Sequence, residues 1–401
     1  MFALRVALLR LWIGLLDLTA RILPVPKPQV FAGPGSAALL CEAIAASGVK
    51  RLLVVSDAAL MKLGLFAPLQ KRLEAAGVKV EVYDGVEPDP TIAQIENGVS
   101  VVKASLAQAV LAFGGGSSMD AAKVIAARAT NAKPVAKMTG LLKIRRAPLP
   151  LYAIPTTAGT GSEVTVGAVV SDPMAQRKLA VIDPKLVPLM CALDGSLMTG
   201  VPAPITAATG MDALTHAVEA YLSRMATPET DAAALEATRL VMRYLPRVYA
   251  QGNDVEARQM MSWAAYRAGV AISRAGVGYV HAIAHNFGGR YHTPHGLANA
   301  IVLPHVLDFC LPSATQRLAH LAHASGITAS GDDTADAKAF IAVVRQLATE
   351  LDIPSRLKSL RKEDIPGIVR DALSEAHATY GVPRYLQKRQ AEALVEGMLP
   401  A

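Results

Sequence analysis

The sequence predicts an α/β domain followed by an all-helical domain, and three observations lead to this fold class. From about residue 50 to residue 200, short β-rich runs alternate with longer helical stretches, which is typical of a parallel sheet with crossover helices. Beyond residue 201, long Ala- and Leu-rich stretches have helical periodicity and few strand candidates. Of the 401 residues, 52% are hydrophobic and 18% are charged, so the chain can bury substantial cores. We therefore expect domains at residues 27–200 and 201–401, preceded by an N-terminal segment, residues 1–26.

The first 23 residues predict an amphipathic helix rather than one that spans a membrane. They are strongly apolar, but charged side chains interrupt them at Arg5, Arg10, Asp17 and Arg21. A spanning helix needs about 20 predominantly apolar residues, and a signal peptide needs about 7–15 uninterrupted ones. On a helix, Arg10, Asp17 and Arg21 fall on one face. We expect the helix to pack on its own subunit or on a partner subunit, and contact with a membrane surface is the alternative.

The elements of the α/β pattern follow in order along the chain. Strands are predicted at residues 52–56, 78–83, 109–113 and 151–154. Helices are predicted after the first strand to about residue 76, over 91–105, and from about residue 118. The turn-rich segment 84–90 separates the second strand from the helix that follows it. Pro202 and Pro204 mark the domain boundary, and the clearest helices beyond it cover 227–244 and 334–351.

Two glycine- and hydroxyl-rich segments follow predicted strands. The segment 114–123, GGGSSMDAAK, joins a strand to a helix, so its backbone amides can approach a phosphate closely. The segment 155–165, PTTAGTGSEVT, offers hydroxyls suited to a phosphate or ribose pocket. Asp57 ends another strand, where a carboxylate accepts hydrogen bonds from a ribose hydroxyl and repels a 2′-phosphate. This pattern favours NAD over NADP; a polar loop and an Asp57 that caps the next helix are the alternatives.

Polar clusters in the second half point to a metal site. Asp212 and His216 are four residues apart, so they share a face if the segment is helical, although a surface hydrogen bond is the alternative. Four of the nine histidines lie within fifteen residues, at positions 281, 285, 292 and 295. Such a cluster is hard to assign to core packing, because each buried imidazole needs polar partners. Spacing alone favours His281 and His285 as ligands, since they would share a helical face.

Together these segments resemble the iron-containing alcohol dehydrogenase family. The resemblance covers residues 27–401, and it adds GMDALTHAVEAY at 210–221 and HAIAHNFGGRYHTPHGLANAIVLPHV at 281–306 to the two glycine-rich segments. It implies an α/β dinucleotide-binding domain and an all-α metal-binding domain, the architecture shared with dehydroquinate synthase. It also implies an oxidoreductase, a metal-dependent, NAD(H)-linked alcohol dehydrogenase or aldehyde reductase. The metal would polarise the substrate oxygen while hydride passes to or from nicotinamide C4.

The resemblance also assigns the site residues. It implies four metal ligands, which are Asp212, His216, His281 and His295. It replaces the spacing-only choice of His285, which takes a supporting catalytic role in proton transfer or orientation. Fe²⁺ is the implied metal, and Zn²⁺ is the alternative because imidazole suits both ions. The NAD site would comprise Asp57, Gly115, Gly116, Ser117, Asp120, Thr156, Thr157, Thr160 and Lys178.

Composition narrows the expected partners and location. The net charge of +7 is spread along the chain and aromatic residues are only 5%, so no nucleic acid partner is expected. The three cysteines lack CxxC spacing, which fits a reducing cytoplasm. We expect a small alcohol or aldehyde substrate and a homo-oligomer, a dimer or larger. The alternatives are a polyol (glycerol-type) dehydrogenase, a metal-dependent hydrolase, and a membrane-surface-associated interaction protein.

Overall fold

The computed structural model describes residues 2–172 and 177–400, and the chain divides into two compact units. The α/β unit comprises Val25–Val201 and Asn253–Tyr266. The helical unit comprises Met1–Pro24, Pro202–Gly252 and Arg267–Ala401. The division at Val201 lies beside the expected boundary, but residues 253–266, which we expected in the helical domain, belong to the α/β unit.

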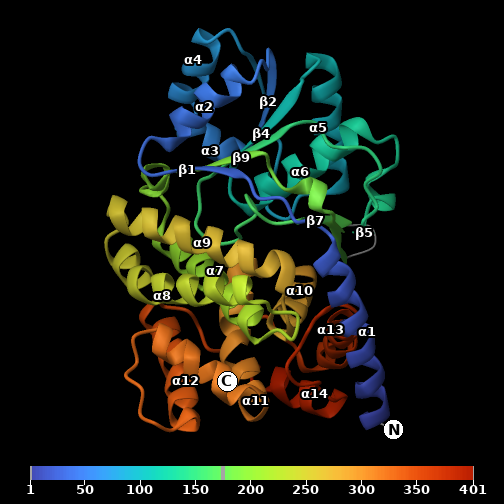
Figure 1. The fold of residues 1–401 in the computed structure, drawn as a ribbon, viewed down its shortest axis with the longest axis vertical. Coiled ribbons are helices and arrows are strands. Elements are labelled where there is room, and N and C mark those ends of the chain that lie inside the picture. The colour runs from blue at the N-terminus through green and yellow to red at the C-terminus, as the bar shows by residue number, and fades with distance from the viewer. Residues whose placement is uncertain (1, 173–176, 401) are drawn as a thin grey trace. The chain divides into compact units, whose positions relative to one another are not determined.

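The α/β unit is built on a six-stranded parallel sheet, which confirms the expected fold class (Figure 1). Its strands run in the order β1-β9-β6-β4-β2-β3. Their bounds are β1 Gln29–Ala32, β2 Arg51–Val55, β3 Lys79–Tyr83, β4 Ala109–Gly114, β6 Leu151–Pro155 and β9 Met190–Leu193. Every residue of β4 and β6 is buried. This explains their continuous apolar sequences, because a parallel strand in the middle of a sheet is covered on both faces.

Helices connect these strands and cover the sheet. They are α2 Ser36–Ala46, α3 Ala58–Lys62, α4 Ala67–Ala75, α5 Ile92–Ser105 and α6 Gly116–Thr130, with the short 3₁₀ helices η1 Val135–Lys137, η2 Pro184–Leu186 and η3 Gly195–Met198. The single helix expected up to residue 76 is two helices, because Gly64 adopts a left-handed conformation (φ +71°) between them. Leu40 and Ile44 of α2 pack with Phe113 of β4 in a fully buried core.

A second, three-stranded sheet in this unit was not expected from the sequence. Its strands are β5 Gly140–Leu141, β7 Gly167–Asp172 and β8 Arg177–Ile182, in the order β5-β8-β7. β7 and β8 pair antiparallel, with Val170 opposite Leu179. Strand β7 begins two residues after the segment 155–165, so its pairing with β8 holds the end of that segment in place.

The helical unit contains α1 Phe2–Ile22, α7 Ala203–Leu222, α8 Pro228–Ala250, α10 Tyr279–Tyr291, α11 His295–Ala324, α12 Asp333–Glu350, η4 Lys362–Asp364, α13 Ile365–Thr379 and α14 Lys388–Glu396. Residues of α9 (Val255–Ala275) belong to both units. Thr227, where the predicted helix 227–244 begins, is the N-cap of α8, and the helix continues to Ala250 through Pro246. Within the described residues, α11 alone is long and apolar enough to cross a membrane. Because 61% of its apolar window is buried in the protein, we treat α11 as a core helix.

Candidate metal centre

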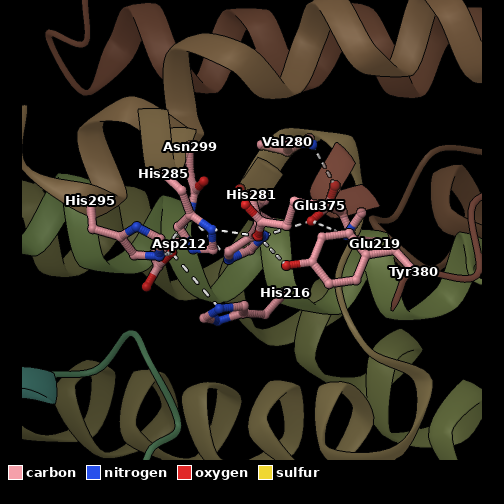
Figure 2. Close-up of polar contacts among 12 residues, drawn as sticks. Asp212, His216, Glu219, Val280, His281, His285, His295, Asn299, Glu375 and Tyr380 are labelled. Atoms are coloured by element: carbon pink, nitrogen blue, oxygen red, sulfur yellow. Dashed lines mark hydrogen bonds and ion pairs between the residues drawn. The ribbon is translucent and has the colours of Figure 1, made fainter. Parts of the chain in front are cut away.

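Four side chains from three helices converge in the interior of the helical unit (Figure 2). They are Asp212 and His216 from α7, His281 from α10, and His295 at the start of α11. One ligand atom from each lies within 4.8 Å of the others. The structure therefore places the four residues that the family resemblance selects in one cluster. His285, which spacing alone favours, lies outside this cluster, with its ring centroid 6.0 Å from that of His281.

Two features of the sequence produce this convergence. Asp212 and His216 are one helical turn apart on α7, and both side chains are buried. Gly296 allows the first turn of α11 to approach α7, because a Cβ atom at this position would lie 2.2 Å from the backbone oxygen of Ala208. The close packing brings Nε2 of His295 to 3.6 Å from Oδ1 of Asp212.

Asn299, one turn beyond His295 on α11, shows that the acceptor atoms face one point. Its Nδ2 lies 2.7 Å from Oδ1 of Asp212 and 3.2 Å from Nε2 of both His281 and His295. Its own Oδ1 is buried and has no partner among the described residues. Three imidazole nitrogens and one carboxylate oxygen, facing one another in a buried site, are a donor set suited to a divalent transition metal. The residues present thus fit the metal that the sequence led us to expect.

Glu219 fixes the orientation of His281. Its Oε2 accepts hydrogen bonds from His281 Nδ1 (2.6 Å) and the backbone N–H of Gly278 (2.9 Å), and its Oε1 accepts one from Val280 N–H (2.7 Å). Because His281 donates through Nδ1, its Nε2 keeps a lone pair that faces the cluster. A carboxylate behind a metal-ligating histidine has this effect in many metal sites.

Burial and neighbouring charges set the protonation of the cluster. Burial lowers the pKa of His281 well below its ordinary value, and nearby His216 lowers it further. Although burial acts to raise the pKa of Asp212, the three histidines and Asn299 together hold it below the usual range. A neutral imidazole and an ionised carboxylate are the protonation states that metal coordination requires.

His285 lies beside the cluster but is held by a different partner. Its Nδ1 is 2.8 Å from Oε1 of Glu375 on α13, and the hydroxyl of Tyr380 donates to the same oxygen. The ring of His285 stacks on that of His295, with centroids 5.5 Å apart. Although burial acts to raise the pKa of Glu375, nearby His285 and the hydrogen bonds from His285 and Tyr380 lower it, so this carboxylate is ionised.

The two glycine-rich segments expected to bind the cofactor meet in the α/β unit. Helix α6 begins at Gly116, directly after β4, and Gly115 is its N-terminal cap residue. A Cβ atom at Gly115 would lie 3.2 Å from Oγ1 of Thr157, and one at Gly116 would lie 2.6 Å from Cγ2 of Thr160. Ser117 follows in the first turn of α6, and Thr156 is buried after β6, where its N–H donates to Gly114.

Three further residues expected in the cofactor site make contacts within the protein. Asp120 accepts hydrogen bonds from Ser162 Oγ and from the backbone N–H of Val169, both at 2.8 Å, so it holds the second segment against α6. Lys178 pairs with Asp89 at 2.6 Å. Asp57 caps α3 by accepting from the N–H of Leu60 at 2.8 Å, the alternative noted from its sequence position. Their contacts with a cofactor stay predictions.

Four polar residues around the cluster received no role from the sequence: Glu219, Asn299, Glu375 and Tyr380. Two of them had a detectable signal. Glu219 follows His216 by three residues and Asn299 follows His295 by four, so each shares a helical face with one of the four cluster residues. Glu375 and Tyr380 are 90 or more residues from His285, and only the tertiary packing of α13 against α10 brings them close.

Comparisons with known proteins identify the same family along almost the whole chain. Residues 26–195 match the family described as iron-containing alcohol dehydrogenase, and residues 206–399 match its C-terminal domain family. The chain is 39% identical to the NAD-dependent methanol dehydrogenase of Bacillus methanolicus, over 88% of this chain and 93% of the relative. It is 36% identical to lactaldehyde reductase of Escherichia coli (strain K12), over 88% and 93%. Its fold matches a crystal structure of 1,3-propanediol oxidoreductase with a TM-score of 0.90 and 35% identity, over 93% and 98%.

Proposed function

The chain belongs to the iron-containing alcohol dehydrogenase family and is a metal-dependent, NAD-linked alcohol dehydrogenase, and from this premise we propose that Asp212, His216, His281 and His295 hold its catalytic metal. The observation that carries the proposal is the convergence of their four donor atoms within 4.8 Å of one another. One carboxylate and three imidazoles would leave a bound divalent ion with a net positive charge, which would polarise a substrate oxygen. We propose Fe²⁺ as this ion, with Zn²⁺ as the alternative.

A divalent metal at this site supplies Lewis-acid polarisation of an alcohol or carbonyl oxygen. The protein's own residues supply the orientation. Glu219 holds His281, and Asn299 lies within hydrogen-bonding distance of two ligand histidines. His285 donates through Nδ1 to Glu375, so its Nε2 is the atom that can accept a proton from the alcohol or return one to the product.

We propose that the first turn of α6 binds the NAD pyrophosphate. The helix begins with Gly116 and Ser117, and the first backbone amides of a helix favour a bound anion, which the lack of a side chain at Gly116 would allow to approach closely. Thr157 and Thr160 pack against the two glycines, so any larger residue at Gly116 would displace Thr160. Thr156, Thr160 and Lys178 would complete the cofactor site, with Asp57 at the adenosine ribose.

The substrate class we propose is a small alcohol or the corresponding aldehyde. Named relatives include a methanol dehydrogenase and a lactaldehyde reductase, both of which act on compounds of this class. We further propose a cytoplasmic enzyme that forms a dimer or larger homo-oligomer, with peripheral membrane contact through residues 1–23. The three cysteines are free and buried, which supports a reducing compartment.

Metal depletion and restoration test the catalytic proposal. Purified protein should reduce NAD⁺ with a primary alcohol, lose this activity when a chelator removes the metal, and recover it with Fe²⁺ under anaerobic conditions. Recovery of activity with Zn²⁺ but not with Fe²⁺ would identify Zn²⁺ as the catalytic metal. Full turnover by metal-depleted protein would overturn the proposal. Light scattering on the purified protein tests the oligomeric state.

A further inference from the structure

Helix α1 carries an apolar stripe that the helical unit does not cover. Of fifteen exposed large hydrophobic side chains among the described residues, seven lie on this one helix, each 48–76% exposed. Six of them form the stripe, recurring at alternating steps of four and three residues: Leu4, Leu8, Leu11, Leu15, Leu18 and Ile22. This spacing places them on one continuous face of the helix, and Trp12 flanks it.

The opposite face of α1 is attached to the protein. Ile13 is buried at 4% exposure, and the indole Nε1 of Trp12 donates to the backbone oxygen of Ala378 at 2.9 Å. Nη1 of Arg274 donates to the backbone oxygen of Ala20 at 3.1 Å. Figure 1 shows α1 lying alongside α13, which it contacts. Because the middle and the C-terminal part of the helix are held, packing fixes the orientation that leaves the stripe exposed.

The charges on α1 indicate what covers the stripe. Arg5 lies on one side of it, and Arg10 and Arg21 lie on the other, as their positions on the helix require. The only acidic residue of the helix, Asp17, already pairs with Arg21 at 2.9 Å. An anionic surface therefore complements this face. A second copy of α1 would bring no free acid to the arginines, and the stripe has no polar residue of the kind that fixes the register of a helix pair.

We propose that α1 lies flat on an anionic phospholipid bilayer, with the stripe at the headgroup–acyl boundary and its arginines at the headgroups. The helix has 21 residues and is therefore about 30 Å long, which gives a straight apolar edge parallel to the membrane plane. Helix α1 precedes residue 26, where the match to the family begins. Membrane contact through α1 would therefore be an addition to the catalytic fold. The inference rests on the proposed membrane contact and not on the dehydrogenase activity.

Vesicle flotation of the full chain tests this proposal. The wild type should float with vesicles of phosphatidylcholine and phosphatidylglycerol, and less with phosphatidylcholine alone or in high salt. Changing Leu8, Leu11, Leu15 and Leu18 together to Gln should lower vesicle binding at least about tenfold, because each leucine buries apolar surface in the membrane. A matched control changes Leu63 and Leu189, which are 70% and 56% exposed outside α1, to Gln and should bind like the wild type.

Equal flotation of the four-leucine variant and the wild type would overturn the proposal. So would a wild type that ignores vesicles and whose size in light scattering falls when the four leucines are changed, since a second copy would then cover the stripe. Oxidation of a soluble alcohol, assayed without vesicles, separates this inference from the catalytic one. We expect the four-leucine variant to keep that activity, so loss of vesicle binding in an active variant reports on the stripe alone.

Discussion

At the scale of single residues, Glu219 illustrates how a side chain that touches no substrate can control a metal site. Its carboxylate accepts hydrogen bonds from two backbone amides and from Nδ1 of His281, and burial raises its pKa to about 7. A Cβ atom at residue 278 would lie 2.7 Å from Oε1 of Glu219, so a larger residue there would displace this carboxylate. The orientation of His281 thus depends on one carboxylate and on one glycine.

Replacing Glu219 by Gln should weaken metal binding. The amide nitrogen of Gln would then face N–H groups that now donate hydrogen bonds to the carboxylate. His281 would lose its fixed orientation as a result. We expect the dissociation constant for the metal to rise about 10–100-fold. Competition with a chromophoric chelator measures this change, and circular dichroism controls for the fold. An unchanged dissociation constant would mean that Glu219 has a structural role only.

Replacing Glu375 by Gln should slow catalysis without releasing the metal. Glu375 holds His285 through Nδ1, so an amide there would release the ring or reverse its tautomer. We expect kcat to fall about 10²-fold, since proton transfer by a positioned side chain contributes 10²–10⁴-fold. KM and metal content should stay close to the wild type, and Glu375→Asp should recover part of the rate. Equal pH profiles and rates for wild type and Glu375→Gln would remove His285 from proton transfer.

Replacing Asp57 by Gly should reduce the preference for NAD over NADP. The carboxylate repels a 2′-phosphate, and its removal eliminates that penalty. Asp57 also caps α3, but a glycine at an N-cap costs only a few tenths of a kcal/mol, so the fold should survive. The measurement is the ratio of kcat/KM with the two cofactors. An unchanged ratio would leave Asp57 with its capping role alone.

At the scale of elements, the helices and strands with the clearest local sequence patterns agree best with their predicted bounds. The strands β2, β4 and β6 are short apolar runs bounded by turns, and their bounds agree with prediction to within one residue. The strands β1 and β9 have four residues each and pair with each other, a contact between distant segments that neither run signals alone. Likewise, the break between α3 and α4 depends on one glycine conformation.

The residues of the candidate site were also only partly predictable from local sequence patterns. The i, i+4 spacing of Asp212 and His216 indicated a shared face, but spacing could not choose between His285 and His295. That choice depends on how closely α11 packs on α7 at Gly296 and on the capture of His285 by Glu375. Both are tertiary contacts, so only the family resemblance could anticipate the outcome.

Lys123 connects α6 to the segment that follows Pro155. Lys123 is 1% exposed, and its ammonium donates to the backbone oxygens of Thr165 (2.8 Å) and Gly167 (2.8 Å) and to the Thr165 hydroxyl (2.9 Å). Lys123→Met should destabilise the protein by about 3 kcal/mol, because these buried acceptors lose a charged donor. Urea unfolding measures the loss, and Lys71→Met, an exposed site on α4, is the control. KM for NAD should also rise. A variant as stable as the wild type would contradict this account.

At the scale of the whole molecule, the proposed metal site joins parts of the chain that are far apart in sequence. Asp212 and His295 are separated by 83 positions, yet their side chains meet in the interior of one unit. Without a cation, the four donor atoms would lie within 4.8 Å of one another, and Nδ2 of Asn299 would be the hydrogen-bond donor that three of them share. A metal that binds only the folded chain would therefore stabilise the helical unit, by an amount that grows with the logarithm of the metal concentration relative to its Kd.

The most direct test of this account is the metal content of two single variants, His295→Ala and His285→Ala, purified in parallel with the wild type. The two rings stack on each other, yet only His295 belongs to the four-atom cluster. We predict that the wild type and His285→Ala carry one metal ion per chain and that His295→Ala carries almost none. Metal loss in His285→Ala together with retention in His295→Ala would contradict the central claim.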